Sequence, residues 1–219
     1  MTRLDLGCGG RGSRWPGFLG VDRLPAPEGP AGAPERYLEL DLVSERWPWP
    51  AGSVDEIIAL HVIEHLKRAD GRALIGRALR ALAPGRTLTV TCPDLEKVVR
   101  AYVARDTALF ETRHNVAGHP LRWPGASLAD QVNWVIHSYG HKWAYDLASL
   151  TLLATEAGAF IEDIRPVSTA SPYYTKPDHE TGIVILARGD EGARAHVSPR
   201  SAELEHRLAV WAKRERGGH

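Results

Sequence analysis

A glycine-rich turn near the amino terminus has the clearest chemical signature in this sequence. The segment LDLGCGG at 4–10 follows a short apolar run, and Asp22 ends the next one. Glycines let the backbone approach a ligand that any Cβ would block, and a carboxylate at Asp22 can accept hydrogen bonds from two ribose hydroxyls. Because Gly7, Gly9 and Gly12 also fit the G-x-G-x-x-G dinucleotide pattern, the ligand's identity stays open at this point. A tight turn without any ligand is the alternative.

A second pair of residues extends this candidate site. Asp41 and Leu42 end a third apolar run, where an adenine edge would lie in an architecture of this kind. The Asp side chain can accept from the adenine amine, and a backbone N–H can donate to a ring nitrogen. An Asp at the end of a strand is also a common turn former, so both interpretations are kept.

The segment from His61 to His65 matches the H-x-x-E-H pattern of a class of zinc peptidases. That chemistry needs both histidines one turn apart on a helix. Here the motif follows the unbroken apolar run 54–60, which predicts a strand, so the two histidines would lie on a strand end and a helix start. We therefore predict no metal site, and stoichiometric zinc in the purified protein would reverse this interpretation.

The elements that must position these residues alternate along the chain. Short apolar runs separated by crossovers predict a parallel sheet with right-handed connections, and the last two strands are close enough in sequence to be antiparallel neighbours. The stretch 106–145 is predicted to be irregular, and the tail from 198 to be an amphipathic helix. The predicted strands are 3–6, 18–22, 37–42, 54–60, 87–91, 160–168 and 181–187, and the predicted helices are 66–82, 94–104 and 146–158.

Composition indicates one domain and narrows the range of partners. The 219 residues suit one domain over 1–190, with 106–145 as an insertion and 191–219 as a tail. The 27 basic and 27 acidic residues balance, which argues against nucleic-acid or membrane partners. Two cysteines, no targeting segment and no apolar run of the ~20 residues that a bilayer requires lead us to expect a cytoplasmic protein. The tail helix could pack on the surface or on a second subunit of a homodimer.

One longer segment makes the pattern specific. SVDEIIALHVIEHL at 53–66, read with the glycine turn, LDL at 40–42, LRALAPGRTLTVTCPDL at 79–95 and HKWAYDLASLTLLATEAGAF at 141–160, resembles class I S-adenosylmethionine (SAM)-dependent methyltransferases. The resemblance is greatest to a small bacterial branch whose fourth strand ends in HVxEHL. It implies a single doubly wound, Rossmann-like α/β domain. The implied sheet is seven-stranded and mostly parallel, with order 3-2-1-4-5-7-6 and strand seven antiparallel.

The resemblance also implies a role for each residue of the cofactor site. Asp5 and the turn Gly7-Cys8-Gly9 would cradle the methionine part of SAM, and Asp22 would hold the ribose. Asp41 and Leu42 would address the adenine, and His61 would border the sulfonium and amino acid end. The family usually has helices before its first strand, which are not seen here, and little room exists for a helix between the turn and the second strand. Cover for the cofactor is therefore expected from the 106–145 insertion or a second subunit.

The expected activity is methyl transfer from SAM to an oxygen or nitrogen of a small molecule, such as a natural product or a sugar. A histidine near neutral pKa suits removal of the acceptor's proton. Two other functions remain open, an NAD-dependent oxidoreductase and a non-catalytic SAM-binding partner subunit. His141 is the favoured base, although it could instead bond a loop carbonyl, and the nearby tryptophans could pack a small core of the insertion. The other candidates are His65, His137 and Tyr145.

Overall fold

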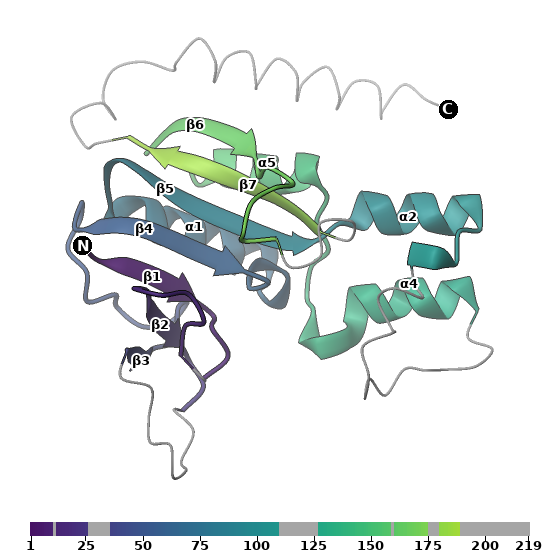
Figure 1. The fold of residues 1–219 in the computed structure, drawn as a ribbon, viewed down its shortest axis with the longest axis horizontal. Coiled ribbons are helices and arrows are strands. Elements are labelled where there is room, and N and C mark those ends of the chain that lie inside the picture. Colours follow the sequence, from purple (N-terminus) through teal and green to yellow (C-terminus); the bar gives the residue numbers. More distant parts are fainter. Residues whose placement is uncertain (11, 26–35, 110–126, 159, 175–179, 189–219) are drawn as a thin grey trace.

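A computed structural model describes residues 1–10, 12–25, 36–109, 127–158, 160–174 and 180–188. Its centre is a seven-stranded sheet with the order β3-β2-β1-β4-β5-β7-β6, which confirms the expected fold (Figure 1). All neighbours pair in parallel except β5–β7 and β6–β7, which are antiparallel. The strands are β1 Arg3–Leu6, β2 Leu19–Asp22, β3 Tyr37–Glu39, β4 Val54–Leu60, β5 Leu82–Pro93, β6 Ile161–Pro166 and β7 Glu180–Ala187.

Strand order explains where a ligand site can form. The chain moves in one direction from β1 through β2 to β3, and in the other from β4 to β5. The connections therefore diverge between β1 and β4, which pair in parallel with Leu4 opposite Ile57. In open α/β sheets, ligands bind outside the carboxyl ends of the strands at such a switch point.

Two helices pack together on one face of the sheet. The helices α1 (Arg68–Ala81) and α5 (Leu147–Glu156) contact each other, and they also contact β5 and β7. Their apolar side chains join those of the strands in one core, which includes the fully buried Leu4, Ile57 and Leu150. Asp146 begins α5, as predicted, because its side chain accepts from Ser149 N in a reciprocal capping box.

A second helix pair extends beyond the carboxyl ends of β4 and β5 (Figure 1). It consists of α2 (Leu95–Ala104), which begins after the predicted cap Asp94, and α4 (Leu128–His137). The two helices share a small hydrophobic cluster around Val98 and Val135. The prediction of an irregular stretch over 106–145 is therefore wrong at α4, where a capping box at Ser127 and an apolar stripe support a helix.

The predicted strand bounds differ from the structure most in β5 and β3, and by one or two residues at the ends of β2, β6 and β7. β5 begins at Leu82 rather than 87. Its pairing with β4 shifts in register between Val54 and Glu56, and the residues around Gly85 form an irregularity within the strand instead of ending it. β3 ends at Glu39 rather than 42, since Asp41 forms a turn there. The predicted tail helix from 198 lies outside the described residues.

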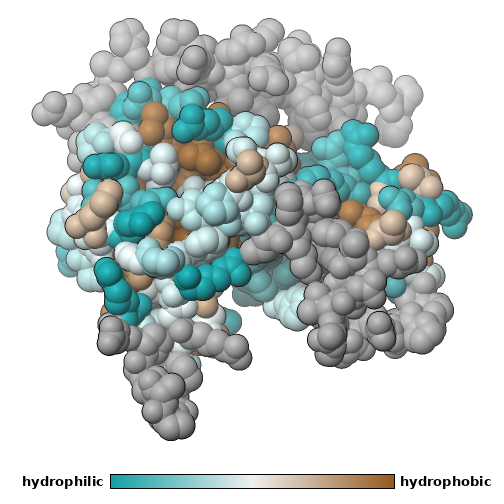
Figure 2. All heavy atoms as spheres, viewed as in Figure 1, coloured by the Kyte–Doolittle hydropathy of each residue, from teal (hydrophilic) through white to brown (hydrophobic). Residues whose placement is uncertain are grey.

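The surface seen in Figure 2 is mostly hydrophilic, with hydrophobic side chains gathered over the strands and in a smaller group over α2. Among the exposed large hydrophobic residues of α2 are Val99, Tyr102 and Val103. None of the described helices combines the length and the hydrophobicity that a bilayer-spanning segment requires.

Candidate functional site

The glycine turn leaves β1 with a backbone that only glycine adopts readily. Gly7 and Gly9 have φ values of +71° and +83°. A Cβ on Gly7 would lie 2.4 Å from Cγ2 of Val62, whereas one on Gly9 would have no neighbour among the described residues within 4 Å. Gly7 is thus required by the close approach of the segment after β4, and the space in front of Gly9 can take a ligand.

Asp22 fixes this turn from the end of β2. Its Oδ2 accepts a hydrogen bond from Gly9 N at 2.7 Å, and its Oδ1 accepts from Leu24 N at 3.0 Å. The carboxylate therefore lies beside the carboxyl end of β1, where the sequence placed it. Because each carboxylate oxygen has more than one lone pair, these bonds are compatible with further bonds to ribose hydroxyls.

Two other residues of the predicted cofactor site are Asp5, in β1 just before the turn, and Cys8, within the turn. Asp5 is only 6% exposed, and burial raises the pKa of its carboxyl against an opposing hydrogen bond from Ser13. Burial, together with Asp5 and Asp22, raises the pKa of the Cys8 thiol to about 11. Cys8 is therefore protonated at neutral pH and does not serve as a nucleophile.

The Asp41 side chain forms a turn just after β3. Its Oδ1 accepts from Val43 N at 2.8 Å and Ser44 N at 3.1 Å, and these bonds lower the pKa of the carboxyl. Leu42 is buried and its carbonyl accepts from Trp47 Nε1. Asp41 therefore forms a turn through its Oδ1. Contact of Asp41 and Leu42 with adenine stays a prediction.

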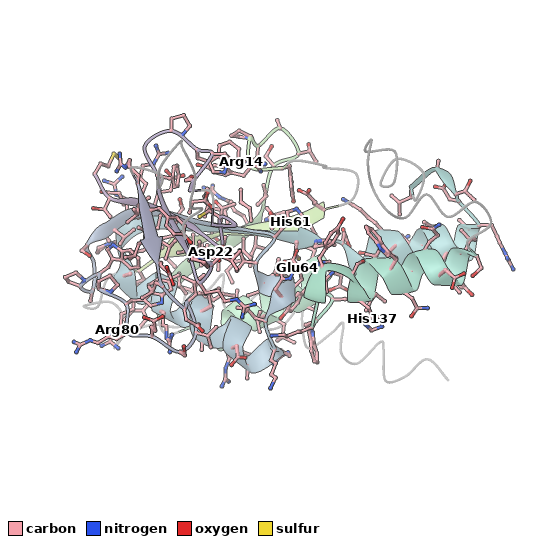
Figure 3. All side chains as sticks on the ribbon, turned by 90° about the horizontal axis from the view of Figure 1, so that it is seen from below. Arg14, Asp22, His61, Glu64, Arg80 and His137 are labelled. Atoms are coloured by element: carbon pink, nitrogen blue, oxygen red, sulfur yellow. The ribbon has the colours of Figure 1, made fainter. Side chains whose placement is uncertain are left out.

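His61 lies directly after β4, near Glu64 (Figure 3), and its ring contacts two buried carboxylates. Its Nδ1 lies 3.1 Å from Oε1 of Glu64, and its Nε2 lies 2.9 Å from Oε1 of Glu180. Burial of the ring opposes protonation, but the bonds to Glu180 and Glu64 outweigh it and raise the pKa of His61 to about 9. The ring is therefore an imidazolium at neutral pH, and the three side chains together carry one net negative charge.

Glu64 is the residue that the sequence-based candidates omitted. It is 2% exposed, and its Oε2 has no hydrogen-bond partner among the described residues. Its ligand oxygen, a nitrogen of His65 and a nitrogen of His141 all lie within 4.8 Å of one another. The H-x-x-E-H segment contains Glu64, but the interpretation of that segment as a strand end and a helix start predicts no role for this side chain.

The structure brings two of the four candidate bases together and leaves two apart. The ring centroids of His65 and His141 lie 4.9 Å apart, and the two rings meet edge to face. His137 is exposed at the carboxyl end of α4. Tyr145 is buried in the core, and burial raises the pKa of its hydroxyl far above neutrality. His137 and Tyr145 are thus poorly placed to exchange a proton with an acceptor.

His141 also makes the carbonyl contact that was its alternative role. Its Nδ1 lies 2.8 Å from the carbonyl oxygen of Val135 in α4, so Nδ1 carries a proton and donates it to that carbonyl. Among the tryptophans of this region, Trp134 packs against the α2–α4 cluster, whereas Trp143 is 45% exposed. The prediction that tryptophans of this region pack a small core is therefore correct for Trp134.

A comparison with solved structures identifies the architecture. A chain in the complex of the Haloferax volcanii Trm112 methyltransferase activator with a putative methyltransferase aligns with 86% of this chain, at 15% identity and a TM-score of 0.50. Human N-acetylserotonin methyltransferase in complex with SAM aligns at 16% identity and a TM-score of 0.52. The chain has the fold of SAM-dependent methyltransferases. A scan against protein-family models and a comparison with curated proteins gave no match.

The similar structures differ in length and in the acceptors that their names imply. The alignment covers 83% of the Haloferax chain and 48% of the human enzyme. It covers 23% of the small RNA methyltransferase HEN1, at 16% identity and a TM-score of 0.53. This methyltransferase fold therefore occurs alone and inside longer chains, and with both small-molecule and RNA acceptors.

Proposed function

We propose that this chain binds SAM and transfers its methyl group to an oxygen or nitrogen of a small-molecule acceptor. The observation that carries the proposal is the hydrogen bond from Gly9 N to the Asp22 carboxylate at the switch point of a methyltransferase fold. A turn with open space in front of Gly9, closed by a buried carboxylate, suits the ribose and amino acid parts of the cofactor. Asp5 lies in β1 just before the same turn.

The charges around β4 also favour a cationic ligand. SAM carries a sulfonium and an ammonium group, and when bound it supplies an electrophilic methyl group. Glu64, His61 and Glu180 together hold one net negative charge at the carboxyl end of β4. A negative potential in a partly buried site attracts such a ligand. A nicotinamide dinucleotide, with its pyrophosphate, would not gain from it.

His65 and His141 are the proposed contacts of the acceptor. Methyl transfer gains mostly from holding the acceptor atom in line with the methyl group, and an O–H or N–H acceptor must also lose a proton. Either imidazole can hold the acceptor by a hydrogen bond and receive that proton. Their edge-to-face contact at 4.9 Å supports a shared site. The balanced charge of the chain supports a small-molecule acceptor rather than RNA.

Transfer of an isotopic label tests this proposal. The purified chain would be incubated with methyl-labelled SAM and with separate small-molecule, RNA and protein fractions of a cell extract. We expect label in the small-molecule fraction, and much less of it with an Asp22→Ala variant at a SAM concentration that does not saturate the wild type. Label in RNA alone would contradict the proposed acceptor class but not methyl transfer, and no label in any fraction would favour a non-catalytic SAM-binding subunit.

A further inference from the structure

We infer that Glu64, His65 and His141 form a binding site for a divalent first-row transition-metal ion. The ligand atoms of the three side chains lie within 4.8 Å of one another, so small side-chain movements would bring them to the ~2 Å bond lengths of a single bound ion. Two imidazoles and one carboxylate are a donor set that Zn²⁺, Fe²⁺ and Co²⁺ accept. Mg²⁺ and Ca²⁺ prefer oxygen ligands, so they fit this set less well.

The carboxylate of Glu64 gives independent support for a ligand. Its Oε1 is engaged by His61 Nδ1, but Oε2 is buried and has no hydrogen-bond partner among the described residues. A buried carboxylate oxygen without a partner is costly. An ion held with His65 and His141 would supply the missing interaction.

The surroundings of the cluster resemble the supports that metal ligands have in proteins. A metal-bound histidine almost always donates its other N–H to a carbonyl or carboxylate. His141 meets this requirement with its Nδ1, which lies 2.8 Å from the Val135 carbonyl oxygen. Because that bond engages Nδ1, an ion would bind His141 through Nε2.

The backbone also holds the two halves of the site together. Lys142 N donates to the Glu64 carbonyl oxygen at 2.7 Å, and Trp143 N donates to the same oxygen at 3.2 Å. His141 is thereby tied to the 3₁₀ helix η1 (Ile63–His65), which carries the other two ligands. A small pocket lined by Glu64, His141 and Trp143 adjoins them.

This site differs from the zinc-peptidase pattern in the sequence. His61 turns to Glu64 and Glu180 instead of joining His65, and the second histidine comes from His141. Three protein ligands leave coordination positions for water or for another oxygen. One such oxygen would be the acceptor's, so that with the ion bound His65 and His141 would hold the acceptor through the ion instead of by their own hydrogen bonds; this last step rests on the proposed function.

Cobalt binding to the untagged full chain tests the inference. After treatment with a chelator and dialysis, Co²⁺ would be added and followed by its visible absorption bands, with stoichiometry from equilibrium dialysis and elemental analysis. We expect one ion per chain, displaced by Zn²⁺. His65→Ala and His141→Ala should each weaken binding by more than about 100-fold, because even the loss of a residue that supports a ligand costs 10–100-fold.

His137→Ala is the matched control, since it removes an exposed histidine of α4 outside the cluster. Circular dichroism would establish that each variant is folded, and Glu64→Gln would keep the size of the buried side chain. Binding of Co²⁺ by the wild type no tighter than by the His65→Ala/His141→Ala double variant would overturn the inference. So would equal loss in the His137→Ala control.

Titration of SAM into the same metal-free samples separates this inference from the proposed function. SAM binding without specific Co²⁺ binding would overturn the metal site alone. Specific Co²⁺ binding without any SAM binding, with or without the ion, would overturn the proposed function and leave the metal site standing.

Discussion

At the scale of single residues, the candidate site depends on buried carboxylates that already hold hydrogen bonds within the protein. Asp22 joins the turn after β1 to the end of β2 through Gly9 N and Leu24 N. Glu64 and Glu180 enclose His61 in the same manner at the end of β4. Such carboxylates are held in one orientation before any ligand arrives, which lowers the entropic cost of binding.

Replacement of Asp22 tests its role in holding the ribose. Hydrogen bonds to charged groups contribute about 1.5–3 kcal/mol each, so Asp22→Ala should weaken SAM binding by at least about tenfold. Asp22→Asn, which keeps one acceptor oxygen, should weaken it less. Isothermal titration calorimetry measures both, with circular dichroism as the check on folding. Equal SAM affinity in wild type and Asp22→Ala would be incompatible with this placement.

Sequence reasoning reached these residues unevenly, for physical reasons. Asp22 and the glycines could be predicted because strand ends and turn glycines are local features. Glu64 has a local signal in the H-x-x-E-H segment, but Glu180 does not, because its contact with His61 joins segments far apart in the chain. The pairing of His65 with His141 likewise depends on the path of the segment that returns to the sheet.

At the scale of elements, two glycines of the turn are needed for different reasons, Gly7 for packing and Gly9 for the space that a ligand would fill. A Cβ at Gly7 would clash with Val62 at 2.4 Å, whereas one at Gly9 would enter open space. Gly7→Ala should therefore lower the free energy of unfolding by about 1–3 kcal/mol. Gly9→Ala should lower it by about 1 kcal/mol for its positive φ, and should mainly weaken SAM binding.

Urea denaturation and SAM titration of the two variants check this separation. We expect Gly7→Ala to lose more unfolding free energy than Gly9→Ala. We expect Gly9→Ala to lose more SAM affinity than its small loss of stability would explain. Full SAM affinity in a folded Gly9→Ala variant would show that the space in front of Gly9 is not used by the cofactor.

The cap of α5 gives a second prediction at this scale. Asp146 accepts from Ser149 N at 2.7 Å, and α5 places Leu150 and Leu153 in the core. Loss of such a cap costs about 1 kcal/mol, so Asp146→Ala should lower the free energy of unfolding by that amount. Urea denaturation measures it, and Glu162→Ala, at an exposed position of β6, should change it little. Equal effects of the two variants would contradict the capping role.

The contact between α1 and α5 should make part of the stability depend on pH. Arg68 donates two hydrogen bonds to Glu156, at 2.8 and 2.7 Å, which lower the pKa of the carboxyl. A lowered folded-state pKa stabilises the protein above the unfolded pKa, and this contribution is lost as pH falls through the folded value. Because the pair is partly exposed, we expect less than about 1 kcal/mol.

Urea denaturation of wild type and Arg68→Gln over a pH series measures this contribution. The difference in unfolding free energy should be present at pH 7 and should shrink as the solution is acidified below pH 4. Glu156→Gln should remove the pH dependence of the difference. A difference that stayed constant down to pH 3 would show that Arg68 acts through packing rather than through Glu156.

At the scale of the whole molecule, the order of the strands could be predicted from sequence because a family resemblance supplied it. Alternating apolar runs give the number and type of the strands, but not which strands are neighbours. The helix α4 was missed because the aromatic and polar residues around it mask its apolar stripe, which becomes evident only when it packs against α2. The switch point between β1 and β4 then brings the glycine turn, Asp22 and His61 to one end of the sheet.

The central claim is that this end of the sheet binds SAM rather than a nicotinamide dinucleotide. Parallel calorimetric titrations of SAM, NAD⁺ and NADH into the purified wild-type chain test it most directly. We predict saturable binding of one SAM per chain and no saturable binding of either dinucleotide. Binding of NAD⁺ or NADH without binding of SAM would contradict it.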